Sequence, residues 1–260
     1  MNAPVITLLS DFGLQDHYVA VMKGVILEIC PPARLIDISH LVAPGDVRSA
    51  AFLLYASHHY FPQGTIHLAV VDPGVGTERK PVAIRVGASY FVGPDNGLFS
   101  LVVNTGSDWE ARSLENVTLR RHPVSNTFHG RDIFAPAAAH LAAGVSFEKL
   151  GPPCDLLSVF REKPVVTKDT VQGEVIHIDR FGNALTNVAL EVLENRAPAK
   201  KWTVSAGGLT LSIRKTYGEA KTGEALALAG STGLVEIAVN GGSAASRLQL
   251  HPGTRVVFRL

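Results

Sequence analysis

The sequence predicts two domains: an α/β domain with a largely parallel sheet, followed by a smaller antiparallel domain of the β-barrel type. Up to about Gly151, short apolar runs alternate with helix-like stretches, which is typical of a parallel sheet covered on both faces. After Lys163-Pro164, short strand-like segments separated by glycines take over. The chain has 260 residues, 46% of them hydrophobic and 18% charged, which is enough for two cores. We place the domains at 1–163 and 164–260.

The first domain opens with a strand and a helix. Val5–Leu9 is apolar and contains β-branched residues, which favours a buried strand that stops at Ser10-Asp11. Apolar side chains then recur at the spacing of one helical face, at Tyr18, Met22, Val25 and Ile29. Cys30-Pro31-Pro32 ends this helix, because a residue before proline disfavours helical backbone angles.

The same alternation continues along the domain. Leu35–Ile38 predicts a strand, and Asp46 is placed to cap a helix that carries Val47, Ala51, Leu54 and His58. Thr65–Val71 predicts another buried strand. Pro136–Leu141 has a helical composition with proline in the first turn, so His129 lies in a loop at a helix entrance.

The second domain is predicted from loosely alternating segments joined by polar turns. The segments are Gly173–Ile178, the region around Trp202, Leu209–Ile213, Leu226–Ala229, Val235–Val239 and Val256–Leu260. Asp179–Asn183 and Gly230–Gly233 have the composition of turns. Glu236 interrupts an apolar series, so its carboxylate is expected to face solvent or to meet a cation.

Charge and composition argue against several classes of function. The 24 Lys and Arg residues nearly balance the 23 acidic residues, so nothing global favours nucleic acid or an anionic membrane. No segment approaches the ~20 apolar residues of a membrane span. The N-terminal residues lack the basic start of a signal peptide, and Cys30 and Cys154 cannot build a disulfide framework. We therefore expect a reduced, cytoplasmic protein without nucleic-acid or membrane partners.

Acidic side chains follow two of the predicted strands, at the strand ends where open α/β sheets bind ligands. Asp11 follows the first strand, with Asp16 shortly after it, and Asp72 follows Thr65–Val71. An alternative for Asp11 and Asp16 is that they cap the next helix. The loop Asp72–Arg79 contains two glycines but lacks the Lys-Ser/Thr of a phosphate-binding loop, so it is interpreted as a turn.

Histidines are a second group of candidates. The chain contains 10 of them, so chance neighbours are common. His58-His59 do not have the spacing of ligands on one helix face, His140 lies inside a predicted helix, and no CxxC pair is present. We expect no metal site, and a metal-dependent nucleotide hydrolase remains an alternative because Asp and His are numerous.

A set of short segments gives the chain its resemblance to one family. They are Leu9–Gly13 with Asp16, Val71–Thr77 with Arg79, Gly93–Gly97, Thr127–Asp132, Asp179–Asn183, and Ser231–Gly233 with Glu236–Asn240. In this order they span nearly the whole chain, and the sequence resembles the S-adenosyl-L-methionine (SAM) hydroxide adenosyltransferases, or SAM hydrolases. These enzymes are relatives of the fluorinating and chlorinating SAM enzymes. Each segment alone is weak evidence for the resemblance, whereas the ordered set is specific to this family.

The resemblance implies an activity and its catalytic residues. The activity is attack of water at the ribose 5′ carbon of SAM, which gives adenosine and L-methionine without a cofactor or metal ion. The implied catalytic residues are Asp72, Arg79 and His129. Because a guanidinium stays protonated, the proton acceptor is Asp72 or His129, and both remain open.

The resemblance also implies how SAM is held. Asp11 would accept hydrogen bonds from the ribose diol. The candidates for the methionyl ammonium and carboxylate are Asp16, Asp179, Glu236, Ser231 and the backbone near Thr232. The candidates for adenine are Asn183, Phe181, Tyr217 and the main chain near Val239. The family's homotrimer, with the substrate between subunits, is expected here as well.

Three departures from the halogenating relatives favour water as the nucleophile. Those enzymes have an aromatic residue where Asp72 stands, and the fluorinating ones have serine where Gly130 stands. The fluorinating ones also carry an inserted loop for which the short Val86–Tyr90 passage has no room. A SAM- or nucleoside-binding module without turnover is a further alternative, and the complete set of Asp72, Arg79 and His129 argues against it.

Overall fold

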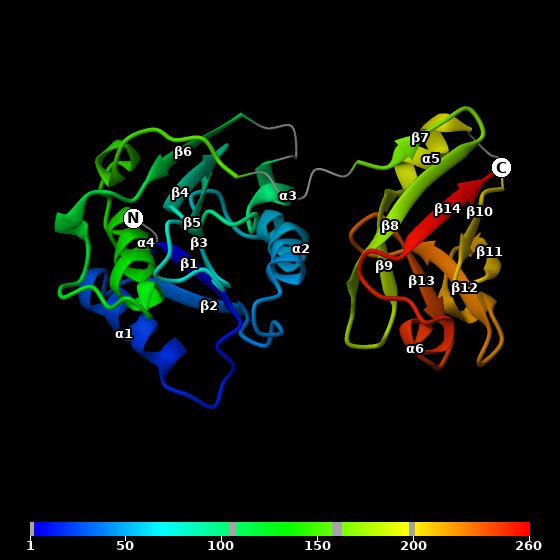
Figure 1. Cartoon of the computed structure of the whole chain (residues 1–260), viewed down its shortest axis with the longest axis horizontal. Helices are drawn as coiled ribbons and strands as arrows, with labels where there is room; N and C mark the ends of the chain where they lie inside the picture. Colours follow the sequence, from blue (N-terminus) through cyan, green and yellow to red (C-terminus); the bar gives the residue numbers. More distant parts are fainter. Residues whose placement is uncertain (1–2, 104–107, 158–162, 198–200) are drawn as a thin grey trace. The chain divides into compact units, whose positions relative to one another are not determined.

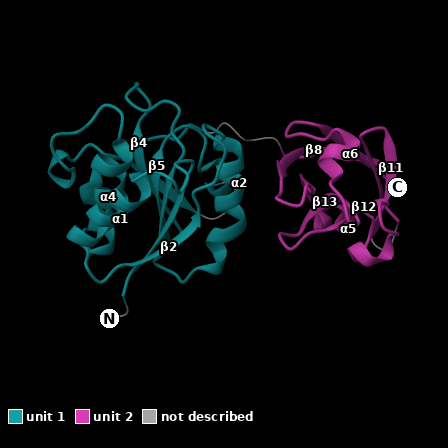
Figure 2. Ribbon diagram, turned by 90° about the horizontal axis from the view of Figure 1, so that it is seen from below, with its two compact units in different colours: residues 1–161 teal, residues 162–260 magenta. Residues whose placement is uncertain are grey.

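A computed structural model describes residues 3–103, 108–157, 163–197 and 201–260. The chain divides into two compact units, residues 1–161 (unit 1) and 162–260 (unit 2), which Figure 2 shows in different colours. Two clusters of buried apolar side chains lie in unit 1, and a separate large cluster lies in unit 2. Each unit therefore has a hydrophobic core of its own.

The described part of unit 1 is built on a six-stranded mixed sheet in the order β2-β1-β3-β5-β4-β6. The strands are β1 (Val5–Ser10), β2 (Arg34–Ser39), β3 (Ile66–Val70), β4 (Pro81–Val86), β5 (Ser89–Pro94) and β6 (Trp109–Ser113). Neighbours from β2 to β5 are parallel, whereas β4 is antiparallel to both β5 and β6. The parallel part confirms the predicted α/β domain, and no sequence pattern predicted the antiparallel edge.

Helices cover both faces of this sheet (Figure 1). The layer on one face contains α1 (Tyr18–Ile29) and α4 (Ala135–Ala142), and the other contains α2 (Val47–Ser57) and α3 (Ser100–Val103). Short 3₁₀ helices lie at His58–Tyr60, Val117–Leu119 and Phe147–Leu150. Successive strand residues point to opposite faces, so Val70 packs in the first layer and Val71 in the second.

The cap of α2 and the buried face of α1 agree with the sequence prediction, except at Tyr18. The Asp46 carboxylate caps α2 by accepting a hydrogen bond from the Ser49 backbone N–H at 2.9 Å. The buried side chains of α1 are Val19, Met22, Val25 and Ile26. Tyr18, predicted as part of that face, is partly exposed and packs against the rings of Phe12 and Phe128.

Unit 2 is a closed barrel with an appended strand (Figure 1). The ring runs β14-β10-β11-β12-β13-β9-β8, with β14 pairing back onto β8, and β7 also pairs with β8. The strands are β7 (Val165–Val166), β8 (Thr170–Ile178), β9 (Ala184–Ala189), β10 (Thr203–Ala206), β11 (Leu209–Arg214), β12 (Ala225–Ala229), β13 (Leu234–Val239) and β14 (Arg255–Arg259). Among the described strands of unit 2, only β11 and β12 pair in parallel, so the barrel is confirmed as largely antiparallel.

Short helical segments and polar turns complete unit 2. The helical segments are α5 (Leu190–Arg196), a 3₁₀ turn (Tyr217–Glu219) and α6 (Ala244–Leu248). Asp179–Asn183 forms the predicted turn, in which the Gly182 N–H donates to the Asp179 carbonyl at 3.0 Å. The strand that follows it, β9, was not among the predicted strands.

Candidate active site

Three loops come together at the carboxyl edge of the parallel strands in unit 1. The loop after β1 carries Asp11, and the loop after β3 carries Asp72 and Arg79. His129 stands at the start of a π-helical turn, Gly130–Phe134, that leads into α4. Such turns are frequent at functional sites. The fold thus places the predicted catalytic side chains on neighbouring loops.

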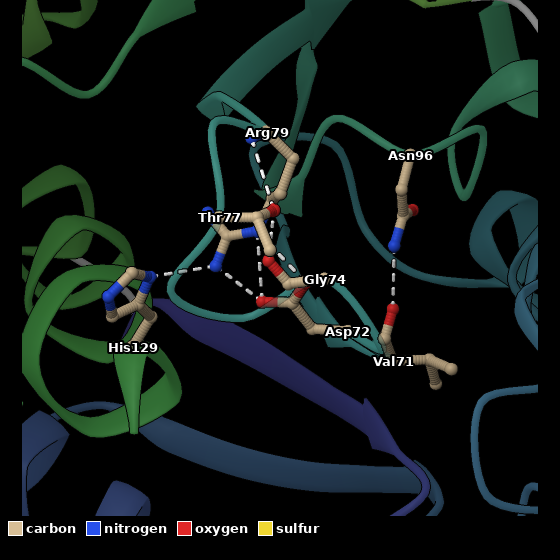
Figure 3. Close-up of polar contacts among 7 residues, drawn as sticks. All are labelled: Val71, Asp72, Gly74, Thr77, Arg79, Asn96 and His129. Atoms are coloured by element: carbon tan, nitrogen blue, oxygen red, sulfur yellow. Dashed lines mark hydrogen bonds and ion pairs between the residues drawn. The ribbon is translucent and has the colours of Figure 1, made fainter. Parts of the chain in front are cut away.

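Asp72, Arg79 and His129 form one connected group (Figure 3). Arg79 Nε donates to Asp72 Oδ1 at 2.9 Å and to Oδ2 at 3.0 Å, and Arg79 Nη2 also donates to Oδ2. The same Nη2 atom lies 2.8 Å from His129 Nδ1. The guanidinium therefore stands between the carboxylate and the imidazole and bonds to both.

The hydrogen bond to His129 determines where its ring carries a proton. A guanidinium only donates, so Nδ1 accepts, and the neutral ring carries its proton on Nε2. Burial, reinforced by the charge of Arg79, lowers the pKa of His129 below its usual range. The imidazole is therefore neutral near pH 7, and its one basic nitrogen is already occupied.

The ion pair between Asp72 and Arg79 is shielded from solvent. Their side chains are 5% and 9% exposed, respectively, so water and salt screen the pair less than they would at the surface. The guanidinium also lies over the ring of Phe134, 5.2 Å from the ring centre, as in a cation–π contact. These contacts hold the two charged groups in one arrangement.

Two residues without an assigned role hold the loops in place. Asn96 Nδ2 donates to the Val71 carbonyl at 2.9 Å and thereby anchors the chain just before Asp72 (Figure 3). Gly76 has a φ of +77° and approaches the loop of His129 so closely that a Cβ would lie 2.6 Å from the Asn126 carbonyl oxygen. In the sequence, the two glycines of this loop could have indicated the close approach, because a left-handed conformation and a short backbone contact both favour glycine.

Asp11 and Asp16 do not cap α1, so the capping alternative is wrong. The N-cap residue is His17, and no side chain bonds the free N–H groups there. Asp11 is partly buried, and its Oδ2 accepts a hydrogen bond from the Gly45 backbone N–H at 2.8 Å. Asp16 is exposed. Asp11 is thus held against the loop after β2 rather than against its own helix.

A cavity of about 460 Å³ opens in unit 2. Its lining residues are Phe181, Asn183, Tyr217, Val239, Asn240, Gly241 and Gly242, the first four of which were predicted to contact adenine. The Phe181 side chain is 78% exposed. A concave wall with aromatic faces and an amide suits a flat heterocycle.

The Asp179 carboxylate organises the turn beside this cavity. Its Oδ1 accepts hydrogen bonds from the backbone N–H groups of Phe181 and Asn183, each at 2.9 Å. Its Oδ2 accepts from Asn183 Nδ2, also at 2.9 Å. Asp179 therefore fixes the orientation of the Asn183 amide.

Glu236 is buried on β13 and bonds to a tyrosine, so the expectation that its carboxylate faces solvent is wrong, whereas its contact with a cation stays a prediction. It is 5% exposed and accepts a hydrogen bond from the Tyr217 hydroxyl. Burial raises the pKa of Glu236, and burial together with Glu236 raises the pKa of Tyr217. Val235 and Ile237 face the barrel core, so Glu236 points the other way, where the Tyr217 segment covers it.

Ser231 and Thr232 lie in the turn between β12 and β13. The Gly233 N–H closes this turn by donating to the Gly230 carbonyl at 3.0 Å, and Ser231 is exposed. The Thr232 hydroxyl oxygen is buried and has no hydrogen-bond partner among the described residues. A buried polar atom without a partner is costly, so this hydroxyl is a group that a ligand could satisfy.

The histidines outside this site are not grouped as metal ligands in the part of the chain that the structure describes. His67 Nδ1 bonds to the Thr7 hydroxyl at 2.8 Å, and its ring centre lies 6.1 Å from that of His58. Across the described ranges, no three or more His, Cys, Asp or Glu side chains are grouped to hold a metal ion. No helix in the same ranges has the length and apolar character needed to cross a membrane.

Comparisons with known proteins agree over most of the chain. Residues 6–151 match the SAM hydroxide adenosyltransferase N-terminal domain, and residues 173–257 match the C-terminal domain. A protein from Thermus thermophilus named (R)-S-adenosyl-L-methionine hydrolase is 44% identical over 95% of this chain and 96% of its own. The crystal structure of an uncharacterized conserved protein from Thermotoga maritima has a TM-score of 0.90 at 40% identity, covering 98% of this chain and 100% of that one.

A more distant relative supports the link to halogenating enzymes. A fluorinase from Nocardia brasiliensis is 29% identical over 99% of this chain and 97% of its own length. The resemblance carried by the ordered segments is confirmed by these matches. The chain belongs to the SAM hydroxide adenosyltransferase family.

Proposed function

We propose that this protein hydrolyses SAM, with water attacking the ribose 5′ carbon to give adenosine and L-methionine. The observation that carries the proposal is the connected group of Asp72, Arg79 and His129 at the carboxyl edge of the sheet. The family adds support, as does the name (R)-S-adenosyl-L-methionine hydrolase of a relative that is 44% identical.

The reaction requires a better nucleophile than bulk water, and it requires no acid to protonate the leaving group. The C5′–S bond breaks as the C5′–O bond forms, and its electron pair stays on sulfur, which leaves as a neutral thioether. Water is a poor nucleophile, with a pKa of ~15.7. A positioned base contributes about 10²–10⁴-fold, and holding the water in line contributes further.

Asp72 is the proposed proton acceptor. His129 offers the water no free lone pair, because Nδ1 accepts from Arg79 and Nε2 carries a proton. A carboxylate has about four lone-pair sites, so the contacts from Arg79 leave Asp72 some accepting capacity. Arg79 and the Nε2–H of His129 are the donors proposed to stabilise the negative charge that develops on the attacking oxygen.

Two local features favour water over halide. A Cβ on Gly130 would lie 3.1 Å from Met22 Sδ and 3.3 Å from the Phe128 ring, so the serine of fluorinating relatives would require these side chains to shift by a few tenths of an ångström. The hairpin between β4 and β5 turns at Gly87-Ala88, so the chain is short where those relatives carry an insertion.

Both units contribute groups to the proposed substrate site. The 1–163 domain supplies the chemistry and, through Asp11, the contact to the ribose diol. The 164–260 domain supplies the adenine contacts at the cavity of Phe181, Asn183, Tyr217 and Val239. Asp16, Asp179, Glu236, Ser231 and Thr232 are proposed for the methionyl group. We further propose a homotrimer in which the first domain of one subunit and the second domain of the next share each substrate.

The proposal includes no metal or additional cofactor, since a charged sulfonium is already an activated leaving group. It also places the protein in the reducing cytoplasm, in keeping with two free cysteines, Cys30 and Cys154, in the described chain. Neither cysteine belongs to the proposed site.

The test is hydrolysis of SAM in ¹⁸O-labelled water, with separation of the products by chromatography and mass analysis. We expect adenosine labelled at the 5′ oxygen, unlabelled methionine, and consumption of the R sulfonium epimer, as the relative's name indicates. Turnover should be unchanged by chelators and by chloride. Binding without products would establish the non-catalytic module, and loss of activity on chelation would establish a metal-dependent hydrolase.

A further inference from the structure

A chain of polar side chains leads away from Ser10, the residue before Asp11, and the proposed reaction does not use it directly. Ser10 Oγ at the end of β1 lies 2.7 Å from His40 Nδ1, which follows β2. The other ring nitrogen, Nε2, lies 3.1 Å from Asp37 Oδ1, without the alignment of a hydrogen bond. Asp37 Oδ2 in turn bonds to Lys23 Nζ at 2.6 Å. Ser10 and His40 are both nearly inaccessible to solvent.

The composition of this group is that of a hydrolase triad, but its geometry is not. Ser10 Oγ is buried and also accepts a hydrogen bond from the Phe12 backbone N–H at 3.3 Å. A nucleophile needs an exposed oxygen facing a substrate. The serine therefore holds the chain rather than attacking anything.

The loop held by these contacts is the one that carries Asp11. The His40 ring bonds to Ser10 before Asp11, and the His40 backbone carbonyl accepts a hydrogen bond from the Gly13 N–H at 2.8 Å. Further along the same segment, the Gly45 N–H donates to Asp11 Oδ2 at 2.8 Å. The residues after β2 thus contact the Asp11 loop before, at and after the carboxylate. Burying an imidazole is unfavourable unless its polar atoms are bonded, so packing alone does not account for histidine here.

We infer that His40 is a positioning residue for ribose recognition, acting through Ser10 to hold the Asp11 carboxylate toward the diol. The inference rests on the proposed function, because it takes Asp11 as the ribose ligand. Holding a carboxylate in its binding geometry lowers the entropy lost when the diol binds. Loss of the contact between His40 and Ser10 should weaken binding of the ground state and the transition state alike. Such a loss raises KM more than it lowers kcat.

Two substitutions of His40 separate its ring nitrogens. Asparagine can place an amide oxygen near the position of Nδ1, whereas glutamine reaches toward the position of Nε2 and cannot bond to Ser10. We expect His40→Gln to raise the KM for SAM about tenfold, the upper end of the loss typical of one hydrogen bond, with a smaller change in kcat. We expect His40→Asn to restore most of the affinity. Equal KM values in the two variants would overturn the inference.

The decisive measurement compares inhibition by adenosine and by 2′,3′-dideoxyadenosine, which lacks the diol. In the wild-type protein adenosine should bind more tightly, and His40→Gln should remove about tenfold of that preference. Ser10→Ala should do the same, and it carries the test if His40→Gln does not fold. A full preference in both variants overturns the role of His40. A wild-type protein without any preference would instead refute Asp11 as the ribose ligand, while 5′-labelled adenosine from SAM would still stand for the reaction.

Discussion

Arg79 Nη2 lies 2.8 Å from His129 Nδ1, and the same guanidinium bonds to both carboxylate oxygens of Asp72. Since a guanidinium cannot accept a hydrogen bond, this contact leaves the imidazole as an acceptor on one side and a donor on the other. The carboxylate is then the group with remaining capacity to take a proton.

Substitutions at His129 and Asp72 should have different effects. Asparagine at position 129 can still accept from Arg79 and donate from its amide, so His129→Asn should retain much more turnover than His129→Ala. Asp72→Asn keeps the shape but removes the base, and kcat should fall by about 10²–10⁴-fold. Single-turnover rates at saturating SAM measure both effects. If His129 is the base, His129→Asn will be as inactive as His129→Ala.

The acid limb of the pH–rate profile should lie below the usual range for histidine. Burial and the charge of Arg79 lower the pKa of His129, so its ring stays neutral as the pH falls through ~6.5. Protonation at still lower pH places a proton on Nδ1, opposite the Arg79 donor, and breaks their contact. The kcat profile of the wild-type protein, compared with that of His129→Asn, measures this limb. A limb at or above pH ~6.5 that His129→Asn abolishes would contradict the lowered pKa.

Gly76→Ala should disrupt the site without unfolding unit 1. A Cβ there would lie 2.6 Å from the Asn126 carbonyl oxygen, and it would force apart the loops of Arg79 and His129. The control is Gly64→Ala, which has a similar φ of +82° but no atom within 4 Å of the added Cβ. Both variants should lose about 1–2 kcal/mol from backbone strain, but only Gly76→Ala should lose turnover. Thermal unfolding and SAM hydrolysis of the same samples distinguish strain from displacement, and normal turnover by Gly76→Ala would refute the role of this close approach.

His67 should make unit 1 sensitive to acid. Burial lowers its pKa to about 3, so between pH ~6.5 and that value the unfolded chain binds a proton that the folded chain does not. Stability is therefore lost as pH falls, by about 2 kcal/mol at pH ~5 from this group alone. The double variant Thr7→Val/His67→Leu should lose less stability than Thr7→Val over the same pH interval, measured by urea unfolding. Parallel curves for the two would show that His67 does not titrate in this way.

Substitutions of Tyr217 and Glu236 should differ in how they change inhibition by the two products, adenosine and methionine. Tyr217→Phe removes the hydrogen bond to Glu236 and loosens the wall of the cavity in unit 2, so inhibition by adenosine should weaken while inhibition by methionine stays unchanged. Glu236→Gln should weaken both, because it weakens the bond to Tyr217 and removes the charge proposed to bind the methionyl ammonium. Inhibition constants for the two products measure the effects. Unchanged methionine inhibition in Glu236→Gln would remove Glu236 from the methionyl contacts and leave it as the support of Tyr217.

Local patterns in the sequence determined most of the individual elements. Val5–Leu9 and Thr65–Val71 are apolar runs of strand length, Asp46 is a side chain that caps a helix, and Asp179–Asn183 has turn chemistry. Each signal depends on a few neighbouring residues, which is why it can be read along the chain. The ordered motifs likewise sufficed to identify the family.

Tertiary structure decided which of these elements meet. The antiparallel edge formed by β4 and β6, the parallel pairing of β11 with β12, and the burial of Glu236 beneath Tyr217 depend on partners distant in sequence. The contact between Arg79 and His129 joins residues 50 positions apart, and it alone determines which imidazole nitrogen is protonated. Hydrophobic periodicity specifies which face of an element is buried, whereas the direction of a hydrogen bond is decided only when the fold brings donor and acceptor together.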